Sequence, residues 1–176
     1  MTNIGTLSRH GVKKIVTHCP HCLNSLRQDY SQFDGHYEVT HHTQFLGELV
    51  AAGKLKATAV MNEKVVYHDP CYLARVNGIT DAPRAPLPEA LTEMPRHGCQ
   101  TACCGAGGGR VWFDDPAPER IGTGRITEAL ETSTKTVAVS CPFCLKMMTD
   151  GIAAKNDLVK VRDIAELMAE ENLNQP

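Results

Sequence analysis

Two segments of this chain match one another closely enough to indicate an internal repeat. KKIVTHCPHCLNSLRQD (residues 13–29) aligns with KTVAVSCPFCLKMMTDG (residues 135–151). In each copy a short β-rich run leads into Cys-Pro-x-Cys-Leu, and a helical pattern follows. A further strand and helix come after each copy, at HYEVTHH with TQFLGELVAAG and at LVKV with RDIAELMAEEN. Strands that alternate with helices over short connections predict an α/β fold with Rossmann-like layers and a mainly parallel sheet.

A third unit lies between the two copies. EKVVYHD (63–69) is typical of a buried strand, and PCYLARVNG (70–78) of a short helix with proline in its first turn. The proline-rich segment 81–100 predicts a loop around one helix near residues 88–94, and ERIGTGRITEALETS predicts a helix before the strand at 136–140. Only the second copy has such a unit upstream. We therefore expect residues 1–56 to be the C-terminal half of a first repeat, its front half missing, and residues 57–176 to be a complete second repeat. On this interpretation the chain is the C-terminal piece of a longer protein.

The eight cysteines are grouped rather than scattered. Two Cys-x-x-Cys pairs and one vicinal pair are typical of metal-ligand sets or redox pairs. The chain opens without an apolar signal core, and no apolar run is long enough to span a bilayer, so we expect a cytoplasmic domain without a membrane span. Structural disulfides are rare in that compartment. The net charge of −2, with acids and bases interspersed, gives no indication of nucleic-acid binding.

Five cysteines of the second copy follow one register, in which Cys71, the pair Cys103-Cys104 and the pair Cys141/Cys144 are separated by thirty-odd residues each. With YHDPCYLAR, CCGAGGGRVW and CPFCLKMMTDG, this pattern resembles the cysteine-rich CCG domain of heterodisulfide reductase and its relatives. It is most similar to the branch linked to electron-transfer flavoprotein. The resemblance covers essentially the whole chain, as one full copy and the Cys-x-x-Cys end of another. It implies that the five cysteines hold a four-iron (4Fe-4S) iron–sulfur cluster of the unusual noncubane type.

The residue types themselves suit such a cluster, because iron–sulfur clusters are held by thiolates. A Cys-x-x-Cys pair at a helix start places two sulfurs on one side of a turn, where the helix N-terminus favours negative charge. Pro142 fits the first helical turn, which needs no amide hydrogen. Four glycines follow the vicinal pair and allow positive φ and close backbone approach, so that successive amides can point at sulfur. These glycines, either a cluster cradle or a flexible loop, are Gly105, Gly107, Gly108 and Gly109.

The first-copy pair, Cys19 and Cys22, matches the family motif but lacks three partners. We expect it to be a partial first-repeat metal set, a free dithiol or a disulfide. His18 and His21 flank the pair and could complete a Cys₂His₂ zinc site, although zinc fits the whole pattern less well than an iron–sulfur cluster.

Several neighbours have two interpretations. His68 is either a hydrogen-bond donor or proton relay at the cluster, or a satisfied core histidine beside a capping Asp69. The His41-His42 pair is expected to cap a helix at the surface. Cys99 falls outside the five-cysteine pattern and is expected to be a bystander.

Arg110 and Trp112 follow the glycines. Arg110 either offsets cluster charge or receives an anionic group, and Trp112 either shields the cluster from water or packs in the core.

Three functions are consistent with this pattern. By resemblance, the first is an electron-transfer domain of a larger oxidoreductase, which passes electrons from a reduced flavoprotein or ferredoxin-type donor towards quinone. Other domains or subunits of the parent would then anchor it at the inner face of the membrane. The second is a heterodisulfide reductase-like catalytic domain, which a substrate-sized pocket above Cys103-Cys104 would favour over a flat interface. The third is a zinc-stabilised interaction module with a Cys₄ site, which the long separation of Cys22 from Cys141 disfavours.

Overall fold

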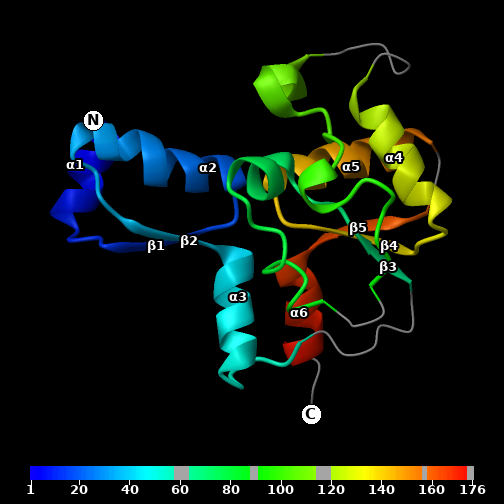
Figure 1. Cartoon of the computed structure of the whole chain (residues 1–176), viewed down its shortest axis with the longest axis horizontal. Coiled ribbons are helices and arrows are strands. Elements are labelled where there is room, and N and C mark those ends of the chain that lie inside the picture. Colours follow the sequence, from blue (N-terminus) through cyan, green and yellow to red (C-terminus); the bar gives the residue numbers. More distant parts are fainter. Residues whose placement is uncertain (58–63, 88–90, 114–119, 156–157, 174–176) are drawn as a thin grey trace.

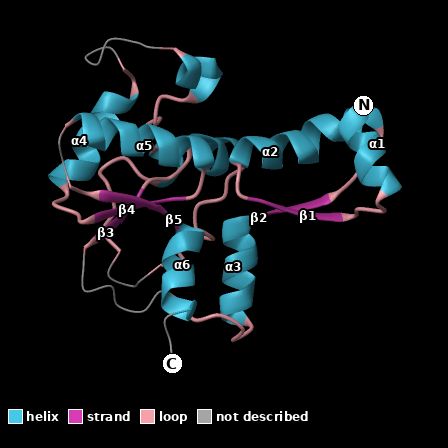
Figure 2. Ribbon diagram, turned by 180° about the vertical axis from the view of Figure 1, so that it is seen from behind, coloured by secondary structure: helices cyan, strands magenta, loops and turns pink. Residues whose placement is uncertain are grey.

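The computed structural model describes residues 1–57, 64–87, 91–113, 120–155 and 158–173. Its strands form two parallel sheets, which Figures 1 and 2 show end to end. In the smaller sheet β1 (Lys14–Thr17) pairs with β2 (Glu38–His41). In the larger sheet β4 (Thr136–Val139) lies between β3 (Val65–Tyr67) and β5 (Lys160–Asp163). The α/β class and the parallel strand direction are confirmed, although the strands divide into two sheets rather than one.

Helices cover both sides of the strands. In Figure 2, α2, α4 and α5 lie on one side and α3 and α6 on the other. The α-helices are α1 (Thr2–Arg9), α2 (Pro20–Asn24), α3 (His42–Ala51), α4 (Gly122–Glu131), α5 (Pro142–Ala154) and α6 (Ile164–Leu173). Shorter helical turns are the π-helices η1 (Ser25–Asp29) and η3 (Tyr72–Val76) and the 3₁₀ helices η2 (Tyr30–Phe33), η4 (Gly98–Gln100) and η5 (Gly107–Trp112).

The predicted repeat is visible in the element order, since β1–α2–β2–α3 corresponds to β4–α5–β5–α6. The predicted short helix after residue 70 is η3, and the predicted helix before β4 is α4. The prediction of a helix near residues 88–94 is wrong for residues 91–94, which are not helical. Residues 88–90 lie outside the described residues. Thr92 donates its amide to the Val65 carbonyl and bridges to Val66, so the chain here runs along the edge of β3.

Strands β3 and β4 of the larger sheet are buried on both faces, and their alternate side chains enter two clusters, as the pleat of a strand requires. One cluster joins strand residues to α6 through Val65, Tyr67, Ala138, Ile164, Leu167 and Met168. The other joins them to α4 and α5 and contains Val66, Val137, Val139, Ile126, Met148 and Ile152, together with Cys104, Cys141 and Cys144. Three thiols of the predicted site therefore belong to the core of the second half.

The carboxyl ends of the two sheets face one another. His42, the first residue of α3, places Nε2 3.0 Å from Oδ1 of Asp163 at the end of β5. Both views show α3 and α6 side by side below this junction. In open α/β sheets ligands bind outside the carboxyl ends of the strands, so the junction is where a site is expected.

Candidate metal centre

The loop after Cys103-Cys104 directs backbone amides at sulfur. Gly105 has φ +93°, in the left-handed region that favours glycine, and a Cβ there would lie 3.0 Å from the Gly122 nitrogen. Its amide donates to Cys103 Sγ at 3.3 Å, and the Gly107 amide also hydrogen-bonds this sulfur. Successive amides around one anionic atom form a nest, so the loop is built to stabilise negative charge on Cys103.

The five cysteines predicted to act together lie in one row of contacts. Cys103 is hydrogen-bonded to Cys71 on one side and to Cys104 on the other. Cys144 Sγ lies 3.4 Å from Cys104 Sγ, and Cys144 also contacts Cys141. Three of these thiols are buried and two, Cys71 and Cys103, are partly exposed. Residues far apart in the sequence are thus gathered into a compact set of sulfur donors.

Mutual hydrogen bonding divides the row into thiols and thiolates. Hydrogen bonds from Cys104 and Cys71 hold the pKa of Cys103 far below its ordinary value. A hydrogen bond from Cys144 lowers the pKa of Cys141 to about 5, against the opposing effect of burial. Conversely, the contact with Cys103 raises the pKa of Cys104 to about 12. Thiolates are the form that binds soft metals, and these hydrogen bonds favour that form at Cys103 and Cys141.

The second Cys-x-x-Cys pair lies at a helix start, as predicted. Cys141 is the N-cap of α5, and Pro142 occupies its first turn. The amides of Phe143 and Cys144 face the Cys141 sulfur. The helix N-terminus carries partial positive charge, so it adds to the stabilisation of thiolate here.

The first Cys-x-x-Cys pair lies against the second. His21 lies beside Cys141 and Cys19, and these two sulfurs raise the pKa of His21 to about 9. Its ring also packs on Tyr72 of η3, with ring centroids 4.0 Å apart. Cys19 is buried and Cys22 is exposed. The long sequence separation that argued against a joint site is therefore not a separation in space.

Even so, the two pairs do not close into a Cys₄ site. Within the described ranges, the group whose ligand atoms all lie within 4.8 Å of one another is His68, Cys104 and Cys144. His18 is not in this group either; its ring lies 6.4 Å from that of His42.

His68 is fully buried at the end of β3 and is held by a buried arginine. Arg125 of α4 donates from Nε to His68 Nδ1 at 2.8 Å. The same guanidinium donates from Nη1 to the Arg96 carbonyl at 2.6 Å and to the Glu128 carboxylate at 2.8 Å. Burial lowers the pKa of His68 to about 3. Among the residues that the structure describes, neither His68 Nε2 nor Arg125 Nη2 has a hydrogen-bond partner, so His68 is not a satisfied core histidine.

Sequence reasoning missed Arg125, although a signal was present. The buried residues of α4 are Gly122, Arg125, Ile126 and Ala129, which is the spacing of one helix face. A charged residue within an otherwise small and apolar stripe must be paired when it is buried. That anomaly could have identified Arg125 as a candidate.

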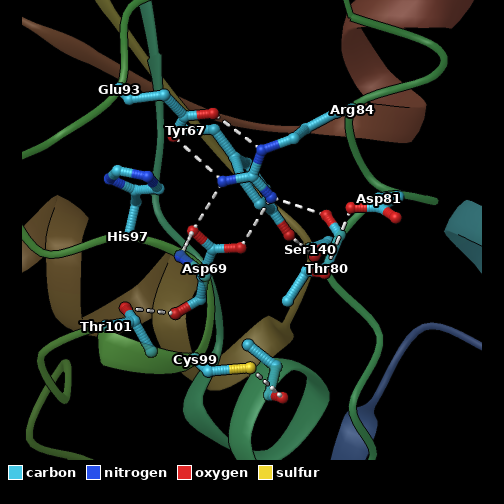
Figure 3. A network of polar contacts seen from close by, with 12 residues as sticks. Tyr67, Asp69, Thr80, Asp81, Arg84, Glu93, His97, Cys99, Thr101 and Ser140 are labelled. Atoms are coloured by element: carbon cyan, nitrogen blue, oxygen red, sulfur yellow. Dashed lines mark hydrogen bonds and ion pairs between the residues drawn. The ribbon is translucent and has the colours of Figure 1, made fainter.

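Asp69 organises the loop that carries Cys71 (Figure 3). Arg84 donates two hydrogen bonds of 2.9 Å to the Asp69 carboxylate and also pairs with Glu93 at 2.7 Å. Asp69 further accepts from the Gly98 amide at 2.8 Å. Asp69 does not cap η3, which follows it in the sequence, but its carboxylate accepts from the first amide of η4 and so ties the end of β3 to the segment that leads into Cys103.

The structure corrects other expectations. His41 caps α3, but it and His42 are buried rather than at the surface. Trp112 is 82% exposed, so it neither shields the thiols nor packs in the core. Cys99 faces the Ala74 carbonyl at 3.6 Å and is outside the row of thiols.

A cavity of about 340 Å³ borders Cys104 and Gly105. It lies between η5, α4 and α5 and is partly apolar, with Met147 and Ile126 in its wall. Its charged lining residues are Arg110, Arg120, Lys146, Lys155 and Asp150. The surface above the vicinal pair is therefore hollowed and mainly basic.

Comparison with known proteins gives a consistent picture. The family model of the CCG cysteine-rich domain matches residues 1–27 and 65–149. The chain is 39% identical over 178 residues to an EtfAB:quinone oxidoreductase of Syntrophomonas wolfei and 40% identical over 177 residues to a probable iron-sulfur-binding oxidoreductase, FadF, of Bacillus subtilis. These alignments cover 94% and 97% of this chain but 25% of each relative.

A third relative is one of the subunits of the dihydromethanophenazine:CoB–CoM heterodisulfide reductase of Methanosarcina barkeri, which is 38% identical over 177 residues. That alignment covers 96% of this chain and 43% of the relative, so the chain spans less than half the length of the curated relatives named here. A glutamate racemase, RacE1, of Bacillus anthracis has a TM-score of 0.41 at 14% identity over 96% of this chain and 59% of its own, a likeness too distant to support an argument. Among the described residues, no helix is both long and apolar enough to cross a bilayer.

Proposed function

Because this chain belongs to the family of the cysteine-rich CCG domain, we propose that it is an iron–sulfur electron-transfer domain of a larger oxidoreductase. The observation that carries the proposal is the row of five cysteines that converge from three parts of the second half. Two relatives are described as a quinone oxidoreductase of EtfAB and an iron-sulfur-binding oxidoreductase, which agrees with this role.

The residues present fit such a cluster. Cys71, Cys103, Cys104, Cys141 and Cys144 would supply the thiolates, and five exceed the four that one cubane needs. This excess supports the noncubane type that the family resemblance implies. The amides of Gly105 and Gly107 would face bridging sulfur, since they already face Cys103. Gly108 and Gly109 would complete the cradle, with φ values of +65° and +79°.

When bound, the cluster would exchange single electrons with little reorganisation, because charge is shared by several irons. The chain provides the surroundings for that exchange. Cys104, Cys141 and Cys144 lie in a packed core that excludes water, while Cys71 and Cys103 reach towards the surface. Electrons would enter from a reduced flavoprotein or a ferredoxin-type donor and leave through other parts of the parent protein towards quinone. Cys19 and Cys22 would be ligands of the first repeat in that longer protein.

A second function, reduction of a disulfide substrate, is favoured by the cavity beside Cys104. A substrate disulfide takes up two electrons and two protons and leaves as two thiols. The cavity is large enough for a small disulfide, and its basic lining suits an anionic one. Consumption of an anionic disulfide with reduced viologen as the electron donor would support this function. An Ala154→Trp variant that fills the cavity but keeps its iron should lose that activity, whereas retained activity would rule out this cavity as the substrate site.

The central test is metal analysis of the anaerobically purified chain. We expect brown protein with iron and acid-labile sulfide in similar amounts, and an EPR signal on reduction. Cys104→Ser should lose most of the iron, while Cys99→Ser, a matched control outside the row, should retain it. Zinc without iron would refute the proposal in favour of a zinc-stabilised module. Iron content unchanged by Cys104→Ser would remove Cys104 from the ligand set.

A further inference from the structure

We propose that His68 donates a hydrogen bond from Nε2 to the sulfurs of Cys104 and Cys144, and that Arg125 positions it by fixing the ring tautomer. The proposal rests on the proposed iron–sulfur function for its effect on the redox potential, but the tautomer itself is a property of the metal-free chain. His68 is thus assigned as a positioning donor at the centre and not as a sixth ligand.

The tautomer follows from the contact with Arg125. A guanidinium has only donors and stays charged in proteins, so the 2.8 Å contact of its Nε with His68 Nδ1 makes Nδ1 the acceptor. An accepting nitrogen carries no proton, and a neutral imidazole has one proton, which must then be on Nε2. A protonated Nε2 has no lone pair to offer a metal. Arg125 therefore excludes ligation through Nε2 and makes this nitrogen a donor.

The surroundings of the ring indicate the acceptor. A ring nitrogen of His68 and the sulfurs of Cys104 and Cys144 all lie within 4.8 Å of one another, and all three residues are buried. Within the described part of the chain, His68 Nε2 has no hydrogen-bond partner. A buried donor without an acceptor is destabilising, so the unpaired N–H of His68 requires a physical explanation. Sulfur that ligates iron as thiolate is a far better acceptor than a thiol, and it would supply the missing partner.

Arg125 is itself held in place. Its side chain is fully buried, and Glu128 and the Arg96 carbonyl fix the orientation of Nη1. Without Arg125, the His68 ring could carry its proton on either nitrogen. Hydrogen bonds to cluster sulfurs are one of the means by which a protein tunes the potential, and they stabilise the reduced, more negative state. His68 and Arg125 together would therefore raise the potential of the cluster.

The first test uses the metal-free chain with ¹⁵N-labelled histidine. Long-range ¹H–¹⁵N correlation spectra should show His68 as the Nε2–H tautomer in the wild type. Arg96→Gln is the matched control, because the Arg96 side chain pairs with Oε1 of Glu128, whereas Arg125 pairs with Oε2. It should keep this tautomer, whereas Arg125→Met should allow the Nδ1–H form. An Nδ1–H tautomer in the wild type would overturn the proposal.

The second test measures the midpoint potential of the iron-loaded chain by EPR-monitored titration. His68→Leu, which has no donor, should lower the ratio of reduced to oxidised cluster about tenfold at a fixed potential, or about 59 mV for one electron. His68→Gln should restore most of this loss, because its amide offers a donor. Direct ¹⁴N ligation in pulsed EPR, or an unchanged potential in His68→Leu with iron retained, would refute the assignment. If Arg125→Met does not fold, the His68 pair still decides the question.

Failure of the two proposals would be distinguishable. A chain that never assembles iron would refute the proposed function, and with it the effect on the potential, while the tautomer spectra would still decide the role of Arg125. A chain that holds iron but whose potential ignores His68 would leave the proposed function intact and refute the present inference.

Discussion

Replacing Gly122 with alanine should break the contact that positions Cys104. Gly122 is the first residue of α4 and lies directly against the Cys104 backbone. A Cβ at this position would lie 2.4 Å from the Cys104 carbonyl oxygen, below the 3.0 Å that real Cβ contacts respect. No side-chain rotation can relieve a clash with backbone. The helix and the vicinal pair must therefore move apart by at least about 0.6 Å, the difference between these two distances.

The free-energy cost of the Gly122→Ala clash can be bounded by comparison with a matched variant. Overpacking of this kind costs about 1–3 kcal/mol, and the gain in helix propensity at a first helical position is small. Gly124→Ala lies in the same helix, and the nearest atom to its Cβ would be Arg96 Nη2 at 4.0 Å. This control should be more stable than the wild type by roughly 0.5–1 kcal/mol. We expect the two variants to differ by about 1.5–4 kcal/mol in free energy of unfolding.

The assay is urea unfolding of the reduced, metal-free chain followed by far-UV circular dichroism, since the exposed Trp112 is a poor reporter of the core. The denaturant dependence should be unchanged, so that the midpoint alone reports stability. Iron content is a second readout, and it should fall in Gly122→Ala but not in Gly124→Ala. If both variants are as stable as the wild type and retain iron, the close contact between α4 and Cys104 does not exist.

Other variants test other parts of the structure. Arg84→Lys should cost roughly 3 kcal/mol in urea unfolding, because lysine cannot keep the two-pronged pair with buried Asp69; a loss below about 1 kcal/mol would contradict this. Gly151→Ala places a Cβ 1.8 Å from Ile126 Cδ1 and should lower the free energy of unfolding by about 1–3 kcal/mol. Adding Ile126→Val to the same chain should restore most of this loss. If the losses of the two substitutions are strictly additive, this contact is not the cause. His41 has a pKa of about 3 in the native state, chiefly through burial, against 6.5 for a free ring. As the pH falls from 6.5 towards 3, only the unfolded chain takes up a proton at His41. The free energy of unfolding should therefore fall by up to about 1.4 kcal/mol per pH unit because of this group. In His41→Gln, the plot of free energy of unfolding against pH should have a correspondingly shallower slope.

The sequence predicts the features that depend on local order. The element order follows from the repeat, and the position of Cys141 at a helix start follows from Pro142 in the first turn. The grouping of Cys71 with Cys103 and Cys104 is what the resemblance of their register to the CCG family implies. In each case the information lies within one segment or in a recurring pattern of segments.

Features that depend on partners across the chain could not be predicted in this way. The apolar stripe of α4 can mark Arg125 as a candidate, but its partners His68 and Glu128 become known only from the fold. The polarity of histidine predicts a surface position for His42, but Asp163 from the other copy compensates for its burial. Pairing of buried polar groups is a tertiary property, so a single sequence without a fold leaves it open.

The boundary at residue 56 separates the two copies of the sequence repeat, but residues on its two sides pack against one another. Leu23 and Val39 of the first half share a buried cluster with Leu73 of η3 in the second. His21 from the first half lies beside Cys141 from the second and lowers the pKa of that thiol. A chain starting at residue 57 would therefore expose Leu73 and take from Cys141 a neighbour that stabilises its thiolate. Negative charge on Cys141 is therefore stabilised by residues of both halves, Cys144 from its own helix and His21 from α2, whereas negative charge on Cys19 is stabilised by His21 and Cys22 and opposed by Cys141. Because the two pairs influence one another in this way, the centre has to be studied in the whole chain.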